Sequence, residues 1–259
     1  MRRTIWLAAL AACFALPGSA GAIIGGQPDG DAHPYVGLLT NNAVTCSGAL
    51  LSPTVMLTAA HCSFSLGTNT VTRAPLVAAS FSADPRHQGG WHIGTFYADP
   101  DADVAIVVFT NSGCSPPATG GPPGATCGPI TSSAYARLPG AGLVDTLDMK
   151  TTVDLVGYGV QGLVRGGGPP QNGPFGTRQF GQTTLIASND KVSGDFLKLH
   201  GGVCFGDSGG PDLLGGTNVV LGVNSYVNDG VCAGVTYSAR VDTPAVLAWI
   251  AAASSRFAT

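Results

Sequence analysis

Short apolar runs recur along the chain, separated by stretches of Gly, Pro, Asn and Asp. They include "YVGLL", "VMLTAA", "DVAIVVF", "TVDLVGYG" and "NVVLGVNSYV". Runs of this length that are rich in Val and Ile favour strands over helices. Many short strands between turn signals are typical of β-sandwiches and β-barrels. We therefore expect an all-β chain.

Only the last segment has the pattern of a helix. In "DTPAVLAWIAAASS", residues 242–255, Thr243 can cap the helix and Pro244 suits its first turn. Two other segments, residues 111–130 and 161–179, are too rich in Pro and Gly for regular structure. We expect the first to link two halves of the chain and the second to be a flexible surface loop.

The first 22 residues differ from the rest. Two arginines precede an apolar stretch, and a Pro/Gly/Ala-rich end follows, with Ala20 and Ala22 at the spacing that signal peptidase prefers. The apolar stretch is too short for a membrane anchor. The Arg2–Arg3 pair alone is weak support for the twin-arginine route. We expect a signal peptide over residues 1–22, a secreted protein, and no membrane contact once the signal is removed.

Composition narrows the function further. Charged residues make up 10% of the chain and the formal net charge is −3. No stripe of Lys or Arg suits a phosphate backbone, so nucleic acid is not an expected partner. Cys13 leaves with the signal, and no C-x-x-C or H-x-x-x-H cluster suggests a metal. We expect no metal or cofactor, and disulfides among the six remaining cysteines, Cys46, Cys62, Cys114, Cys127, Cys204 and Cys232.

One serine stands in an unusual setting, "GVCFGDSGGP". Ser208 there fits either a surface turn or a nucleophile, and a nucleophilic serine needs a base. His61, in "LTAAHCS", follows the end of a predicted strand. His33 and His87 have no chemical argument in their favour, and His200 is near Ser208 only along the chain. His61 is therefore the candidate base.

A catalytic histidine also needs a group that orients it. The segment "DPDADVAIVVF" offers Asp99, Asp101 and Asp103. Only Asp103 leads directly into an apolar strand, which would place its carboxylate at the rim of a core. A buried carboxylate is costly unless it is paired, and a histidine N–H would supply the partner.

Four motifs occur in order along the chain: "IIGG", "LTAAHC", "DVAIV" and "GDSGGP". Together they resemble the chymotrypsin-like (trypsin-fold) serine protease family over essentially the whole mature chain, and we expect a secreted bacterial-type member. The resemblance implies two six-stranded antiparallel Greek-key β-barrels and a C-terminal helix. The first barrel would span about residues 23–110, the linker about 111–130, and the second barrel with the helix about 131–259.

The resemblance also assigns roles. It makes His61 the general base, Asp103 its orienting partner and Ser208 the nucleophile of a serine endopeptidase that works through an acyl-enzyme. The N–H groups of Gly206 and Ser208 would form the oxyanion hole, and a side chain at Gly206 would obstruct the carbonyl oxygen. Ser225 would support Asp103. The implied disulfides are Cys46–Cys62 and Cys204–Cys232, which leaves Cys114–Cys127.

Partners follow from the same resemblance. It implies protein or peptide substrates and proteinaceous protease inhibitors, and we expect a monomer. Relatives that cut after Lys or Arg carry an acidic residue where this chain has Gly202, followed by Val203. The resemblance implies that the substrate is bound by Gly202, Val203, Ser225, Tyr226 and Val227. Tyr226 and Val227 would line the entrance of the substrate pocket, and Val227 would narrow its mouth. Burying the charged side chain of a substrate Lys or Arg without a counter-charge would cost too much free energy. We therefore expect cleavage after small or medium apolar residues.

Two other acidic residues keep the question of substrate charge open. Asp229 or Asp212 could supply a negative charge to the pocket from elsewhere in the chain.

Activation departs from the family pattern as well. Family zymogens are typically cut after a basic residue, and the new amine pairs with the aspartate beside the nucleophile. Here Ala22 precedes Ile23, so signal cleavage itself would free the Ile23 amine to pair with Asp207. Cleavage after Ala20 would instead leave residues 21–22 as a short propeptide.

Three other interpretations stay open. A catalytically silent relative could act as a secreted binding protein. A GDS-type lipase would share three letters of the serine motif, but such enzymes carry it near the start of an α/β chain. A non-enzymatic secreted β-domain would have to acquire all four motifs by chance.

Overall fold

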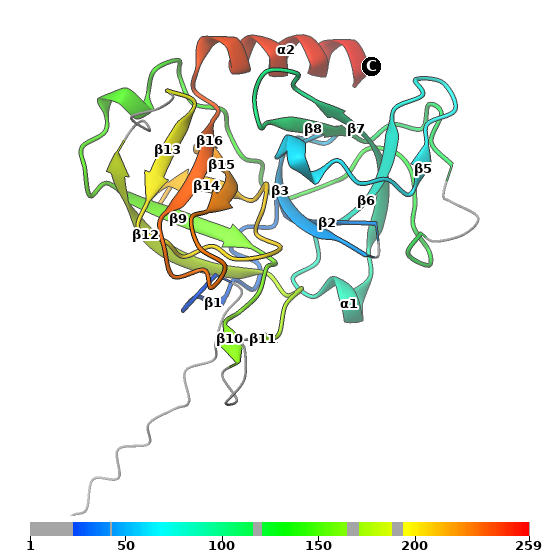
Figure 1. The fold of residues 1–259 in the computed structure, drawn as a ribbon. Coiled ribbons are helices and arrows are strands. Elements are labelled where there is room, and N and C mark those ends of the chain that lie inside the picture. Colours follow the sequence, from blue (N-terminus) through cyan, green and yellow to red (C-terminus); the bar gives the residue numbers. More distant parts are fainter. Residues whose placement is uncertain (1–22, 42, 116–120, 165–170, 188–193, 259) are drawn as a thin grey trace, which may run out of the picture.

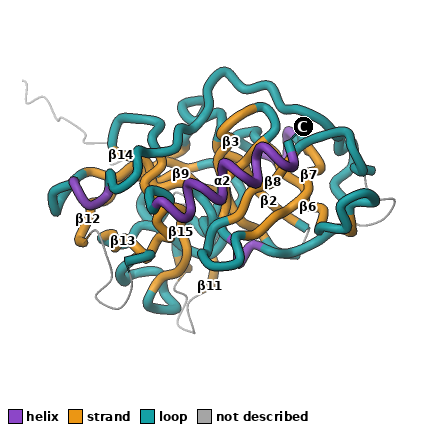
Figure 2. The backbone as a smooth tube through the Cα atoms, turned by 90° about the horizontal axis from the view of Figure 1, so that it is seen from above, coloured by secondary structure: helices purple, strands orange, loops and turns teal. Residues whose placement is uncertain are grey.

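The computed structural model describes residues 23–258 except 42, 116–120, 165–170 and 188–193. Two antiparallel barrels lie next to each other, the first built from the blue-to-green part of the chain and the second from the green-to-orange part (Figure 1). Helix α2 (Pro244–Phe257) runs across one side of the molecule, from the second barrel toward the first (Figure 2). The expected signal peptide and Cys13 lie outside the described residues.

The first barrel closes through the pairing of β2 with β6. Six strands form the closed ring in the described chain, and a short seventh strand adds beside β6. In ring order they are β2 (Val36–Thr40), β3 (Thr45–Ser52), β4 (Val55–Thr58), β8 (Ala105–Val108), β7 (Trp91–Ala98) and β6 (Pro75–Ser80), with β5 (Gly67–Thr68) added.

The second barrel closes through the pairing of β12 with β9. Its six-stranded ring also carries a short extra strand, which pairs with β12. In ring order the strands are β12 (Gln179–Ala187), β13 (Phe196–Leu199), β16 (Thr236–Arg240), β15 (Val220–Val227), β14 (Pro211–Leu214) and β9 (Thr152–Gly157), with β1 (Gln27–Pro28) added.

Short elements complete the described chain. They are the 3₁₀ turns η1 (Ala60–Cys62) and η2 (Val144–Thr146), the helix α1 (Pro85–Gln88), and a hairpin of β10 (Leu163–Val164) and β11 (Gln171–Asn172). None of the helices in the described ranges has the length and the apolar run that a membrane crossing needs.

The two closed six-stranded barrels and the C-terminal helix confirm the expected fold. The helix begins as predicted, because the Thr243 side chain accepts a hydrogen bond from the Val246 N–H and Pro244 occupies the first turn. Val246, Ile250 and Ala253 of α2 are buried against the barrels.

Two details of the expected layout were wrong. Residues 161–179 are not all loop, because β10 and β11 pair there. The start of the chain belongs with the second barrel rather than the first, since β1 pairs with β12 and Ile23 packs in the second barrel's core. Hydrophobic runs mark strands but carry no information on which sheet a short leading strand joins.

A buried arginine joins the two barrels. The Arg178 guanidinium forms an ion pair with Asp29, with 2.8 Å between Nε and Oδ2, and it donates to the carbonyls of Val36 and Phe81 in the first half of the chain. The Tyr158 hydroxyl also donates to the Val36 carbonyl. These polar contacts hold the barrels in a fixed relation, which matters because the candidate site draws residues from both.

Candidate active site

Side chains from both barrels meet where the barrels face each other. His61 belongs to η1, which follows β4, and Asp103 lies just before β8; both belong to the first barrel. Ser225 lies in β15 of the second barrel, and Ser208 lies in the loop that leads into β14.

The Asp103 carboxylate orients the His61 ring and is itself held by Ser225. His61 Nδ1 lies 2.8 Å from Asp103 Oδ2, the His61 backbone N–H donates to Oδ1 at 2.9 Å, and the Ser225 hydroxyl donates to Oδ2 at 2.5 Å. Burial raises the pKa of Asp103, but the hydrogen bonds from His61 and Ser225 outweigh it and hold the pKa below its ordinary value. The carboxylate therefore stays ionised beside the ring at neutral pH.

This arrangement selects one form of the neutral imidazole. An ionised carboxylate only accepts hydrogen bonds, so Nδ1 must carry the proton and Nε2 is left with a free lone pair. The His61 side chain is 41% exposed, so a substrate can approach it. Ser208 lines the same cavity as His61, although no hydrogen bond joins the two side chains in the described chain.

Backbone conformation and close packing account for the glycines around Ser208. Gly206 has φ +98°, and a Cβ there would lie 2.9 Å from the Gly159 Cα. A side chain at Gly206 would therefore clash with the protein backbone itself. At Gly209, φ is +76° and a Cβ would lie 2.6 Å from the Ser47 carbonyl oxygen of the first barrel. Left-handed backbone and close packing between barrels both demand glycine here.

Ser47 anchors the serine loop to the first barrel. Its N–H donates to the Ser208 carbonyl at 2.8 Å and its hydroxyl donates to the Gly206 carbonyl at 2.9 Å. The carbonyls on either side of Asp207 are thus held, which fixes the direction of the intervening peptide groups.

Asp207 is completely buried beside this loop. Its carboxylate accepts hydrogen bonds from the N–H groups of Gly159 and Cys204, both at 2.9 Å. Burial nevertheless raises the pKa of Asp207 to about 8, and the charge of Asp212 adds to the rise. No cation pairs with Asp207 among the described residues. Nearby, Ile23 is buried and the Ile24 N–H donates to the Gly202 carbonyl at 2.7 Å, so the segment expected to pair with Asp207 is docked in the second barrel.

A first cavity of about 270 Å³ opens beside Ser208; we call it the β15-side cavity. Val203, Ser225, Tyr226 and Val227, all predicted to bind substrate, are among its lining residues, together with Cys204, Phe205, Ser208, Asn224 and Asp229. Gly202 does not line it. A Cβ at Gly202 would lie 2.6 Å from the Leu155 side chain, so a larger residue there would displace that side chain, and its φ of +111° disfavours any side chain.

The two acidic residues left open by the sequence differ in position. Asp229 does line the β15-side cavity, where its Oδ1 accepts the N–H groups of Val231 and Ala233 at 3.0 and 3.1 Å. Asp212 is fully buried in β14 and is not a lining residue. Burial raises the pKa of Asp212 to about 8, so it is mostly neutral at pH 7.

A second cavity of about 370 Å³ also borders Ser208; we call it the His61-side cavity. His61, Gly206, Ser208 and Phe205 line it, with Val44, Phe175 and other residues from both barrels. Ser208 and Phe205 border both cavities, so the serine lies between two recesses.

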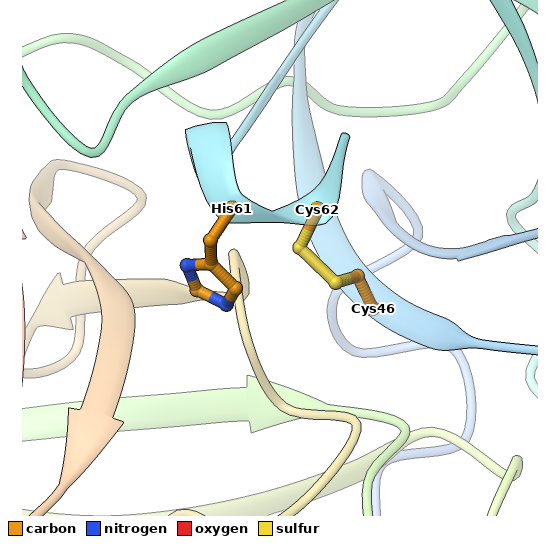
Figure 3. A group of neighbouring side chains, drawn as sticks. All are labelled: Cys46, His61 and Cys62. Carbon is orange, nitrogen blue, oxygen red and sulfur yellow. A yellow bond between two sulfur atoms is a disulfide. The ribbon is translucent and has the colours of Figure 1, made fainter. Parts of the chain in front are cut away.

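The three expected disulfides are present: Cys46–Cys62, Cys114–Cys127 and Cys204–Cys232. The first lies beside His61, as Figure 3 shows. The ligand atoms of Cys46, His61 and Cys62 lie within 4.8 Å of one another, which is a spacing that could suit a metal ion. Both sulfurs are bonded to each other, however, so neither is a thiolate ligand.

Several residues that border the cavities beside Ser208 were not predicted from the sequence. Asn224 lines the β15-side cavity, while Val44 and Phe175 line the His61-side cavity. Phe205 was within the quoted serine motif but received no role. An aromatic residue such as Phe175 in a Gly/Pro-rich segment was the one available signal, because exposed apolar side chains mark interaction surfaces.

Comparisons with known proteins agree with this geometry. The model of the trypsin family matches residues 23–250. Serine protease SP24D of Anopheles gambiae is 26% identical over 221 residues, covering 79% of this chain and 71% of the mosquito protein. This relative comes from a mosquito, so it does not support the expectation that the chain is a bacterial-type member of the family. That expectation stays a prediction.

Solved structures show the same fold. HL collagenase superposes with a TM-score of 0.59 at 19% identity, covering 86% of this chain and 94% of that one. Human heparin binding protein superposes with a TM-score of 0.60 at 20% identity, covering 89% and 96%. The family match spans most of the chain, and both barrels and the site motifs lie within it. The chain therefore belongs to the trypsin family.

Proposed function

We propose that this protein is a secreted serine endopeptidase in which Ser208, His61 and Asp103 form the catalytic triad. The observation that carries the proposal is the hydrogen-bonded chain from Ser225 through Asp103 to His61, which ends at a cavity lined by Ser208. A nucleophile, a base and an orienting carboxylate in one place is the arrangement that acyl transfer requires.

The first half of the reaction forms an acyl-enzyme. Because Asp103 holds the proton of His61 on Nδ1, Nε2 can accept the Ser208 hydroxyl proton as Oγ attacks the carbonyl carbon of the substrate. The N–H groups of Gly206 and Ser208 stabilise the negative oxygen of the tetrahedral intermediate. When the intermediate collapses, the C–N bond breaks and His61 gives its proton to the leaving amine.

The second half repeats these steps with water. His61 Nε2 takes a proton from a water molecule, which attacks the ester carbonyl of the acyl-enzyme. Collapse of the second intermediate releases the acid, and the proton returns to the Ser208 oxygen. The positively charged imidazolium formed in each half is stabilised by the ionised Asp103 carboxylate.

The β15-side cavity would hold the side chain of the residue before the cut. Val203 and Val227 give it apolar walls. Asp229 is its single acidic lining residue in the described chain, and two backbone N–H groups already engage that carboxylate. We therefore propose cleavage after small or medium apolar residues rather than after Lys or Arg.

Signal cleavage after Ala22 would activate the enzyme. The freed Ile23 amine would pair with Asp207, whose burial without a cation raises its pKa to about 8. An ion pair there would stabilise the loop that carries Gly206 and Ser208. N-terminal sequencing of active secreted protein should find Ile23 as the first residue; an active form that begins elsewhere contradicts this step.

The expected setting is extracellular. Three disulfides form and persist in oxidising compartments. We propose a monomer of bacterial type that acts on protein or peptide substrates and is open to proteinaceous protease inhibitors.

Labelling with a fluorophosphonate probe tests the central proposal. The secreted protein should be labelled, and Ser208→Ala should not be. Ser65→Ala is a matched control, since Ser65 is a serine whose hydroxyl donates to a local backbone carbonyl away from the cavities. Equal labelling of wild type and Ser208→Ala, or no labelling of wild type, contradicts a serine nucleophile. A peptide library then reports the residue before the cut.

A catalytically silent binding protein is the second candidate, since one structural neighbour is named for heparin binding. Heparin is a polyanion, and this chain has a net charge of −3 with 12 Lys and Arg among 259 residues. Complementary charge is the usual basis for binding a polyanion. Retention on a heparin column at physiological salt without fluorophosphonate labelling would favour this candidate over the protease.

A further inference from the structure

Large apolar side chains are exposed around the His61-side cavity. Val44 is 50% exposed, Phe175 39% and Phe205 49%, and all three line this cavity. Soluble proteins rarely leave several large apolar side chains together in water unless the surface binds something. The cluster of Val44, Phe175 and Phe205 therefore indicates a binding surface for an apolar group.

Local contacts hold the backbone of Val44 and Phe205 and the ring of Phe175. Val44 sits in a turn whose N–H groups are accepted by the Asn41 side chain. The Arg86 guanidinium lies 3.8 Å from the centre of the Phe175 ring. The Phe205 carbonyl accepts the Val160 N–H at 2.8 Å. The surface is thus formed before a ligand arrives, which lowers the entropic cost of binding.

Charged groups find little in this cavity to bind. His61 is its single ionisable lining residue in the described chain, and the proposed mechanism occupies His61 with proton transfer. The polar lining side chains are neutral, such as Thr45 and Asn172. A carboxylate or ammonium group entering here would lose water without gaining a counter-charge from a lining side chain, because Arg86 stacks on the Phe175 ring and does not line the cavity.

The position of His61 tells which part of a substrate lies here. In the proposed mechanism His61 gives its proton to the leaving amine, so the chain that follows the cut must pass on the His61 side of Ser208. The β15-side cavity, which borders Ser208 but not His61, is left for the residue before the cut. We propose that the His61-side cavity binds an apolar side chain from the residue directly after the scissile bond, and that Phe175 and Val44 set this preference.

This inference rests on the proposed protease function, and an acyl-transfer experiment separates the two. An activated ester substrate forms the acyl-enzyme, and an added amino-acid amide competes with water for it. The amine nitrogen attacks the ester carbonyl of acylated Ser208, His61 takes the amine proton, and a peptide bond forms as the Ser208 oxygen leaves and regains a proton. The ratio of aminolysis to hydrolysis measures binding on the leaving-group side alone.

Leucinamide should be a better acceptor than glycinamide by about tenfold, which is typical of discrimination by an apolar pocket. Aspartamide should be no better than glycinamide. Phe175→Ala should reduce the leucinamide ratio about fivefold, with little change for glycinamide, and Phe175→Leu should restore most of it. Met149→Ala is the matched control, because Met149 is an exposed apolar residue, at 74%, that lines neither cavity.

The outcomes separate cleanly. Failure to hydrolyse any ester, with no acylation of Ser208, overturns the proposed protease function. Normal ester hydrolysis with equal aminolysis by leucinamide, glycinamide and aspartamide overturns the leaving-group preference. Equal effects of Phe175→Ala and Met149→Ala would overturn the role of Phe175.

Discussion

Asp212 makes the stability of this protein depend on pH. Its side chain is fully buried in β14, and neither carboxylate oxygen has a hydrogen-bond partner of normal geometry in the described chain. Burial raises its pKa from 3.8 to about 8, and an interaction with the Ser238 hydroxyl offsets only part of the effect. Asp212 is therefore protonated in the folded protein at pH values where it is ionised in the unfolded chain.

The sign and the size follow from proton linkage. Between pH 3.8 and about 8 the folded state holds one more proton at Asp212 than the unfolded state does, so raising the pH favours unfolding. Each pH unit in this interval costs about 1.4 kcal/mol. Between pH 5 and pH 8, Asp212 should reduce the free energy of unfolding by about 3 to 4 kcal/mol.

Asp212→Asn removes this titration while nearly keeping the shape of the side chain. Urea unfolding followed by circular dichroism would be measured from pH 5 to pH 8, with Ser208→Ala in every protein to prevent self-digestion. The stability of Asp212→Asn minus that of its parent should increase by about 3 to 4 kcal/mol over this range. Only the change of this difference with pH is compared, so the pH-independent cost of burying the asparagine amide cancels.

Asp148→Asn serves as the control, because it removes an exposed carboxylate. Its stability profile should run nearly parallel to that of the parent. Parallel profiles for Asp212→Asn as well would refute the argument, since they would mean that Asp212 has the same pKa folded and unfolded.

Three further predictions concern the site and its support. Asp103→Asn should lower kcat about 10⁴-fold in a chromogenic ester or peptide assay, because the wrong tautomer of His61 is favoured, and unchanged kcat would exclude the proposed triad. Gly206→Ala should lower kcat about 10²-fold and slow fluorophosphonate labelling. The alanine Cβ would lie 2.9 Å from the Gly159 Cα and the left-handed φ is unfavourable for alanine, so the loop would shift and displace an oxyanion donor. Replacing both Cys114 and Cys127 by Ala should lower the free energy of unfolding by about 3 kcal/mol in urea titrations with little change in kcat, since this disulfide closes a loop in the linker.

Local sequence patterns predicted much of this protein. The Val- and Ile-rich runs are strands, and Thr243 with Pro244 begins the C-terminal helix. Such features depend on residues a few positions apart, so a single sequence displays them. The motifs around His61, Asp103 and Ser208 pointed to the family for a similar reason: each one is a short stretch of specific residue types.

The geometry of the site needed the tertiary structure. Asp103 meets His61 across 42 residues and Ser225 across 122, distances along the chain that no local pattern can span. The packing at Gly206 also needed the fold, because the backbone of Gly159 occupies the space next to it only in the folded protein. Spacing in sequence suggests which residues cooperate, whereas barrel closure decides which atoms meet.

Local residue patterns were thus enough to predict the strands, the C-terminal helix and the candidate chemistry. Three features became visible only once the chain was folded: β1 joins the second barrel, Asp212 is buried without a partner of normal geometry, and Val44, Phe175 and Phe205 share one cavity. The difference lies in the range of the interactions. Hydrogen bonding and hydrophobic periodicity within an element act between near neighbours, while cavities and buried charges arise where distant segments pack.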